Sequence, residues 1–152
     1  MTVTATGSVS ATEGGGVSLR STGASATANV ATVEGSTYGL RATNYGPGAM
    51  SITATGAVTG TSDEGIHAQN GFVRTSRGEV TKSRGSSVVL GGTDLTISTA
   101  AVSGGTDGIY ALNNGTGALS ITTTGTVTGT SGRGIFAGNG GSVSTVQDDD
   151  YG

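Results

Sequence analysis

Ten acidic residues are the groups in this sequence best suited to acid–base or metal chemistry. Several recur at one point of a repeated phrase, just before its closing segment: Glu13, Glu34, Asp63, Glu64 and Asp107. If the repeats stack, these carboxylates form an acidic edge that could hold calcium weakly, because Ca²⁺ takes carboxylate oxygens. Arg133 interrupts the series in the last repeat, which favours a solvated corner. Catalysis by two carboxylates needs them to converge across a cleft, and the pattern predicts none.

The remaining candidates for chemistry are isolated. His67 is the only histidine, and its alternation with Ile66 and Ala68 predicts a surface position without a partner. No nucleophile elbow, zinc-protease motif or phosphate loop is present. Asp148 to Asp150 are typical of a solvated tail. We therefore predict a protein that is not an enzyme, with no catalytic, cofactor-binding or metal-binding residues.

Four of the seven basic residues gather between positions 74 and 84: Arg74, Arg77, Lys82 and Arg84. A basic band on a sparsely charged protein could contact an anionic glycan or a lipid headgroup. A divergent surface segment without a ligand is the alternative interpretation, and the sequence favours it.

Threonines recur in Thr-x-Thr pairs: Thr4 with Thr6, Thr53 with Thr55, Thr59 with Thr61, Thr122 with Thr124, and Thr128 with Thr130. On a flat face these pairs form a lattice of hydroxyl and methyl groups that is similar to the face of β-helical ice-binding proteins. Arg74 and Ser76 stand where a further pair is expected. The same hydroxyls could accept O-linked glycans, and threonine also suits exposed strands because it is β-branched and polar.

Composition narrows the class of protein. The 152 residues include 30 glycines, one proline and no cysteine, so disulfides and thiolate metal sites are excluded. The net charge of -3 argues against a nucleic-acid partner, which needs a basic surface. Apolar runs are too short for a transmembrane segment. The first residues lack the basic and apolar regions of a signal peptide.

An internal repeat positions all of these residues. The segment AMSITATGAVTGTSDEGIHAQN, beginning at Ala49, matches ALSITTTGTVTGTSGRGIFAGN, beginning at Ala118, at 15 of 22 positions without a gap. Their offset of 69 residues equals three periods of 23. Weaker copies lie between and before them. The least regular copy runs from Phe72 to Thr93, where Val88 and Leu90 are expected at the positions of Ile66 and Ala68.

Each copy divides into three short alternating segments separated by glycine, so one face of each is buried. Strands this short need stacked neighbours. The sequence therefore predicts an all-β parallel β-solenoid of about six turns of about 23 residues, with three short strands in each turn. The core columns are expected to contain Ile52, Ile97 and Ile121, and Ile66, Ile109 and Ile135. A structural ladder is expected from Asn44, Asn70, Asn113 and Asn139, because an amide both donates and accepts hydrogen bonds.

The phrases SITATGAVTGTSDEGIHAQN and SITTTGTVTGTSGRGIFAGN resemble the glycine- and threonine-rich turns of the right-handed β-helical passengers of bacterial autotransporters, the type V secreted adhesins. The resemblance covers nearly the whole chain except the turn from Phe72 to Thr93. It implies an extracellular or cell-surface location, tethered to the outer membrane in a longer parent protein. Residues 1–152 are then one solenoid segment, in which 142–152 form an incomplete last turn or a tail.

These observations lead to three hypotheses of different classes. The first is a non-enzymatic structural or adhesive stalk that contacts a host surface, an abiotic surface or a glycan and self-associates through exposed solenoid ends. The second is an ice- or crystal-binding Thr-x-Thr face. The third is a carbohydrate-active β-helix enzyme, which ranks last because no acid–base pair is evident. Possible surface-binding residues under these hypotheses are Thr53, Thr55, Thr122, Thr124, Arg74, Arg77, Lys82 and Arg84.

Overall fold

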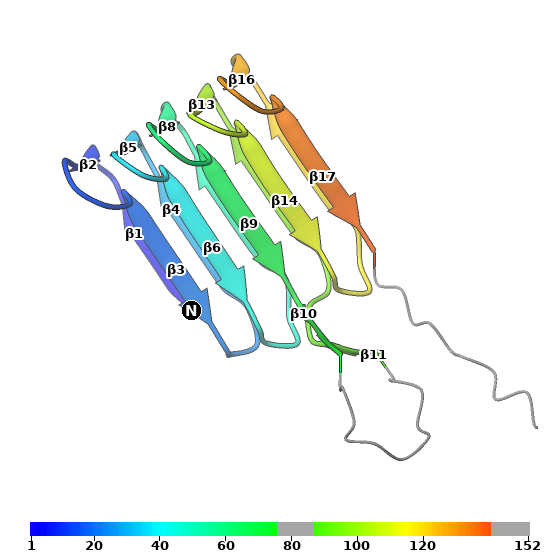
Figure 1. The fold of residues 1–152 in the computed structure, drawn as a ribbon. Coiled ribbons are helices and arrows are strands. Elements are labelled where there is room, and N and C mark those ends of the chain that lie inside the picture. The colour runs from blue at the N-terminus through cyan, green and yellow to red at the C-terminus, as the bar shows by residue number, and fades with distance from the viewer. Residues whose placement is uncertain (76–86, 141–152) are drawn as a thin grey trace, which may run out of the picture.

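In its described residues the chain winds into a column of five stacked turns, each built from three short strands (Figure 1). The computed structural model describes residues 1–75 and 87–140, with the side chains of residues 1–71 and 91–140. In these residues every regular element is a strand. It follows that no helix in the described part of the chain is long and apolar enough to cross a membrane.

Three parallel sheets of five strands run along the column. Sheet A contains β1 (Thr2–Ala5), β4 (Ala26–Val30), β7 (Met50–Ala54), β12 (Leu95–Thr99) and β15 (Leu119–Thr123). Sheet B contains β2 (Val9–Ala11), β5 (Val33–Gly35), β8 (Val58–Gly60), β13 (Val102–Gly104) and β16 (Val127–Gly129). Sheet C contains β3 (Val17–Ser21), β6 (Leu40–Asn44), β9 (Ile66–Asn70), β14 (Ile109–Asn113) and β17 (Ile135–Asn139).

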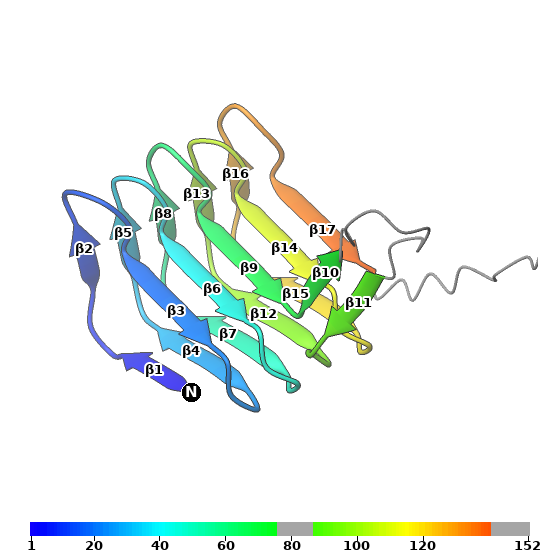
Figure 2. The same ribbon diagram turned by 60° about the horizontal axis from the view of Figure 1, so that its bottom comes forward.

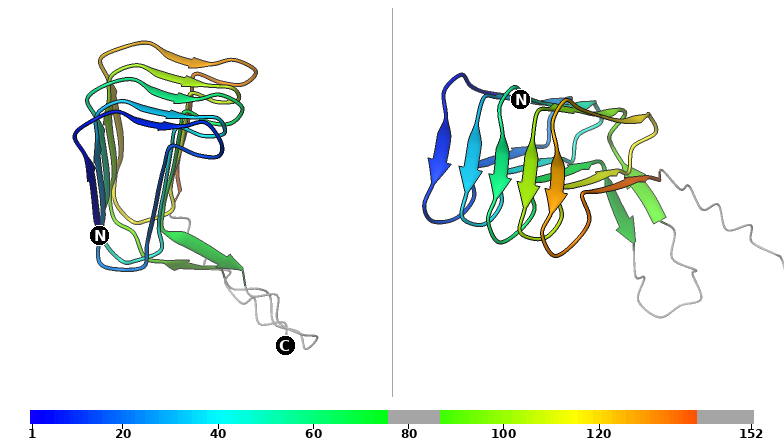
Figure 3. Two further views of the ribbon diagram at one scale, coloured as in Figure 1. Left: turned by 90° about the vertical axis from the view of Figure 1, so that its left-hand side faces the viewer. Right: turned by 90° about the horizontal axis from the view of Figure 1, so that it is seen from above.

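The three sheets form the walls of the column. Sheets A and C face each other and sheet B closes one side, as the views in Figures 2 and 3 show. Short connectors from sheet C to the next strand of sheet A form the remaining side. This arrangement leaves each sheet with one face toward the core and one face toward solvent, which accounts for the period-two pattern in the sequence.

The register places like residues over like residues, as the repeat predicted. Ile52 pairs with Ile97 and Ile97 with Ile121, while Ile109 lies between Ile66 and Ile135. Ile52 and Ile121 are therefore two turns apart, not the three that the offset of 69 residues suggested. The difference arises because the segment between Gly71 and Gly91 contributes an antiparallel pair of strands and no turn of the column.

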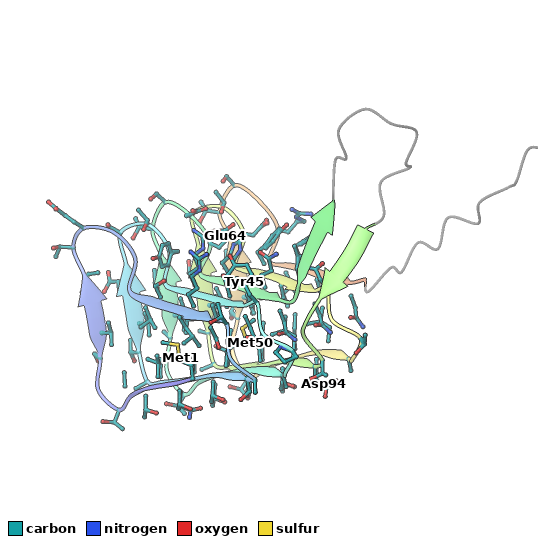
Figure 4. The ribbon with its side chains drawn as sticks, turned by 90° about the horizontal axis from the view of Figure 1, so that it is seen from below. Met1, Tyr45, Met50, Glu64 and Asp94 are labelled. Carbon is teal, nitrogen blue, oxygen red and sulfur yellow. The ribbon has the colours of Figure 1, made fainter. Side chains whose placement is uncertain are left out.

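The core consists of aliphatic side chains in these columns. Ile52, Ile66, Ile97 and Ile109 are fully buried, and so is Met50, whose side chain is labelled in Figure 4. In the last turn the equivalent Ile135 is 43% exposed and Ile121 is only partly buried. Inner turns therefore receive most of the hydrophobic stabilisation, because they are covered on both sides.

The segment that was expected to form an irregular turn from Phe72 to Thr93 forms no turn. Its strands β10 (Phe72–Thr75) and β11 (Ser87–Leu90) pair antiparallel, with Val88 opposite Arg74. This β-hairpin projects away from the column (Figures 2 and 3). Val88 and Leu90 therefore do not continue the core columns, and the described residues form five turns of the column.

Glycines allow the chain to leave the column and return to it at one place. Gly71, Gly91 and Gly92 have φ values of 78°, 75° and 84°, a region that residues with a Cβ atom rarely adopt. The Gly71 N–H still donates to the Asn44 carbonyl at 2.8 Å, as in an uninterrupted corner. The hairpin is thus an insertion into one connector, and stacking continues past it.

Deleting residues 72–90 is expected to leave the solenoid folded. The deletion joins Gly71 to Gly91 and leaves five residues between Asn70 and Leu95, the same number that separates Asn44 from Met50. Because long surface insertions contribute little to stability, we expect a midpoint of thermal unfolding within a few degrees of the original. Circular dichroism and thermal unfolding would measure this. Loss of the β-sheet spectrum would show instead that the hairpin is integral to the column.

Candidate functional site

The four predicted asparagines form one hydrogen-bonded ladder inside the column. Asn44 Nδ2 donates to Asn70 Oδ1 at 2.9 Å, Asn70 Nδ2 to Asn113 Oδ1 at 3.2 Å, and Asn113 Nδ2 to Asn139 Oδ1 at 3.1 Å. The first three side chains are fully buried. A buried amide is costly unless its donor and acceptor are both satisfied, so the ladder is a structural element of the stack.

Asn44 and Asn113 also close the connectors that follow them. Asn44 Nδ2 donates to the Gly48 carbonyl at 3.0 Å, and the Gly46 N–H donates to Asn44 Oδ1 at 3.1 Å. Asn113 makes the equivalent bonds with Gly117 and with the N–H of the residue two positions on. The amide therefore satisfies backbone groups that would otherwise be buried without partners.

Sequence reasoning missed the first member of this column. Ser21 pairs in register with Asn44. Its Oγ donates to the Ser25 carbonyl at 3.3 Å and accepts from the Gly23 N–H at 3.2 Å. The hydroxyl thus closes its own corner as the asparagines do. The signal was the spacing of 23 residues between Ser21 and Asn44, which the change of residue type concealed.

The corner carboxylates do not converge on a metal or on each other. In the described residues no three acidic or histidine side chains come close enough to hold a metal ion. Asp63 Oδ1 instead accepts a hydrogen bond from Thr106 Oγ1 at 3.4 Å. Glu34 lies on β5, where it pairs in register with Ser10 and Thr59. The acidic edge expected from the sequence is therefore divided among separate local contacts.

Asp107 is the corner carboxylate with the most specific environment. It is 8% exposed, and its Oδ1 accepts the Arg133 backbone N–H at 2.6 Å. The Arg133 guanidinium adds an ion pair, with Nη2 at 3.2 Å from Oδ2. The backbone hydrogen bond from Arg133 is the main cause that holds the pKa of Asp107 below its ordinary value, and the guanidinium acts in the same direction against the effect of burial.

This interaction predicts a pH-dependent contribution to stability. The pKa of Asp107 is lower in the folded state, so the stabilisation is present above the unfolded value of about 3.9 and disappears as pH falls through the folded value. Asp107→Asn is expected to cost about 1 kcal/mol at neutral pH, since the exposed guanidinium is screened. Urea unfolding of both proteins at neutral pH and near pH 2 measures this. A difference that does not shrink in acid would contradict the assignment.

His67 belongs to a stacked row of rings, contrary to the expectation that it has no partner. Its ring centroid lies 5.1 Å from that of Tyr110, which lies 4.8 Å from that of Phe136, with interplanar angles of 21° and 17°. His67 Nδ1 is 3.4 Å from Glu64 Oε1. The Arg133 guanidinium carbon lies 4.2 Å from the Phe136 ring centroid. The row follows one outward column of sheet C.

The outward face of sheet A is chemically uniform. Its two columns contain only Thr, Ser and Asn: Thr2, Thr27, Ser51, Thr96 and Ser120 in one, and Thr4, Asn29, Thr53, Ser98 and Thr122 in the other. The strand spacing of about 4.8 Å repeats these groups along the column. The result is a flat polar face without a charged residue.

The predicted threonine pairs are divided between two faces. Thr53 and Thr122 lie in the sheet A lattice, and Thr55 and Thr124 directly follow the same strands. The pairs that begin at positions 59 and 128 start on sheet B, on β8 and β16. A shallow, open depression of about 300 Å³ on the sheet A face is lined by Thr4, Ala5, Thr6, Asn29, Val30, Ala31, Thr53 and Thr55.

The interruption expected at Arg74 and Ser76 does not occur in this lattice. Arg74 lies on β10 of the hairpin, and the fourth turn supplies Thr96 and Ser98 instead. Ser76, Arg77, Lys82 and Arg84 lie outside the described residues. Of the predicted basic band, Arg74 is the one described member, and it lies on the antiparallel strand β10 and not on a strand of the column.

Comparisons with known proteins add no assignment. No protein-family model, no curated protein and no solved structure matches the chain.

Proposed function

We propose that this chain is a segment of a non-enzymatic, cell-surface structural and adhesive stalk of the kind found in autotransporter passengers. The observation that supports this most is that the strands of all three sheets pair from turn to turn along one axis, and that the asparagine ladder follows the same axis. Such a column lengthens by about 4.8 Å for each added turn. It presents extended outer faces for contact while its interior serves only stability.

Binding without turnover is the test of this proposal. Purified chain would be applied to an array of glycans and to mineral and polymer surfaces, and the same preparation would be assayed for polysaccharide cleavage. We expect saturable binding to at least one surface, lost on unfolding, and no release of products. Cleavage of a polysaccharide would overturn the proposal, as would the absence of binding to every surface.

Self-association of this chain is part of the same proposal. The strands of the first and last turns have in-register partners on one side only among the described residues. Unpaired strand edges and the partly exposed Ile135 favour stacking of a second copy. Light scattering over a wide concentration range should show mass rising with concentration. A constant monomer mass would exclude this part of the proposal.

The polar face of sheet A favours a second candidate function, binding to ice or another regular crystal surface. Ten outward side chains in two in-register columns form a periodic array of hydroxyl and amide groups. Thr27→Lys with Thr53→Lys should abolish any thermal hysteresis. Thr59→Lys with Ser103→Lys, on neighbouring strands of sheet B, is the matched control and should retain it. Absence of hysteresis in the unaltered chain would reject this function.

A further inference from the structure

The column concentrates its positive charge on one face. Four of the seven Lys and Arg residues lie within 72–90, and the other three are Arg20, Arg41 and Arg133. Arg20 is on β3 and Arg41 on β6 of sheet C, while Arg133 precedes β17 of the same sheet. The five strands of sheet C contain no acidic residue. The strands of sheet A contain no acidic residue either, but they contain no basic residue, so sheet C is the one sheet of the column whose described strands carry arginine. The nearest carboxylate to its ring row is Glu64, which precedes β9 and lies 3.4 Å from His67.

Arg20 and Arg41 form an uncompensated pair. Ser18 is opposite Arg41 and Arg20 is opposite Thr43, so the two arginines are diagonal neighbours on adjacent strands, with their Cα atoms about 8 Å apart. Both side chains are exposed, and no ion pair to either is present among the described residues. Arg133 differs, because Asp107 neutralises it. The two positive charges lie on neighbouring strands of one face, so a polyanion that runs along the column could pair with both.

Aromatic packing orients one of these guanidinium groups. The Arg20 guanidinium carbon lies 5.0 Å from the ring centroid of Tyr45, which follows β6 and is labelled in Figure 4. A cation over a ring gains electrostatic attraction and loses side-chain freedom. An arginine held in this way presents a planar fork that matches a carboxylate.

The face continues beyond the arginines as a row of rings. Arg41 is followed in its register column by His67, Tyr110 and Phe136. Because the rings stack on one another, they present their electropositive edges outward, which suit oxygen atoms of a ligand. The row of rings follows the column axis across three strands, and Arg41 extends the same register column to a fourth, so an extended polymer fits it better than a compact ligand.

We propose that the outer face of sheet C binds a linear, carboxylated polysaccharide, with Arg20 and Arg41 pairing with its carboxylates and the ring row supporting its sugar residues. The inference rests on the adhesive function proposed above and names the face and the ligand class. A polysaccharide fits better than a nucleic acid, because the rings cover one another's faces and leave little ring face on which bases could stack. The two arginines can each pair with one carboxylate of such a polymer.

Polygalacturonate and its fully methyl-esterified form are the probes that test this proposal, with binding measured by affinity electrophoresis. The unaltered chain should bind polygalacturonate, and binding should weaken as salt is added. Arg20→Gln with Arg41→Gln should weaken it by about tenfold or more. Arg77→Gln with Arg84→Gln removes the same charge from the insertion and should leave the affinity within about twofold of the original. Circular dichroism confirms that both variants are folded.

Several outcomes would overturn the proposal. Equal affinity for the esterified polymer would exclude pairing with carboxylates, and a larger loss in the Arg77 and Arg84 variant would place binding on the insertion. Tighter binding of single-stranded DNA, with the same dependence on Arg20 and Arg41, would identify a nucleic-acid face. Failure to bind polygalacturonate while the chain still binds another surface of the array would reject this ligand and leave the adhesive function intact.

Discussion

Asn70→Ala is expected to lower the free energy of unfolding by about 3 kcal/mol, because a buried group left without its partner costs about 1–3 kcal/mol. Asn70 lies at the centre of the ladder and is fully buried. The substitution removes the acceptor of Asn44, the donor to Asn113, and the hydrogen bond at 3.0 Å to the Asp94 carbonyl. The hydrogen bond to Asp94 joins the two sides of the point where the hairpin is inserted, so its loss should also loosen that point.

Asn139→Ala is the matched control for that experiment. Asn139 is the last rung and is exposed, and among the described residues its side chain contributes the acceptor for Asn113 Nδ2 and no other bond. Its loss should cost less than about 1 kcal/mol, since water can replace a hydrogen bond at an exposed site. Urea unfolding followed by circular dichroism compares the two variants. Equal destabilisation would show that the ladder does not stabilise the interior of the column.

Ile109→Ala is expected to destabilise the solenoid by about 2–5 kcal/mol, the cost of emptying a buried isoleucine site. Ile109 is fully buried between Ile66 and Ile135, which pair with it in the neighbouring turns. The interior is narrow, and strands held by sheet hydrogen bonds on both sides cannot move inward to close the cavity.

The same substitution in the last turn should have a much smaller effect. Ile135 occupies the equivalent position but is 43% exposed. Truncating this side chain loses only part of the free energy of burying an isoleucine, about 1 kcal/mol, and creates no enclosed cavity. Denaturant unfolding of Ile109→Ala and Ile135→Ala gives the comparison. A larger effect at Ile135 would mean that the end of the column is covered in solution.

Much of the fold follows from identity between repeats. The isoleucine columns and the asparagine rungs were predictable because residues of one type recur at one place in every turn, and parallel stacking puts equivalent positions next to each other. The candidate faces were less predictable. The Thr-x-Thr spacing identified threonines on sheet A but omitted Thr2, Thr27, Ser51, Thr96 and Ser98, because a mixture of Thr, Ser and Asn in register does not produce one repeated motif.

The inserted hairpin shows why pattern alone was insufficient. Val88 and Leu90 alternate with other residues as a core strand does, and a hairpin strand produces the same period of two. In the structure β11 pairs antiparallel with β10, and the chain leaves and re-enters the column at Gly71 and Gly91, whose positive φ values suit glycine. The described residues form five turns, close to the about six that the spacing predicted.

The sequence by itself determined a parallel β-solenoid with aliphatic columns and an asparagine ladder, because each of these repeats along the chain and needs no knowledge of distant contacts. Only the tertiary structure decided which surface residues meet. Arg20 and Arg41 become diagonal neighbours, and His67 joins Tyr110 across 43 residues of sequence, because the register of sheet C and the exclusion of the hairpin set their positions. A surface site assembled from several turns depends on that register. The outward residues differ in type from turn to turn, so the sequence repeat does not reveal which of them become neighbours.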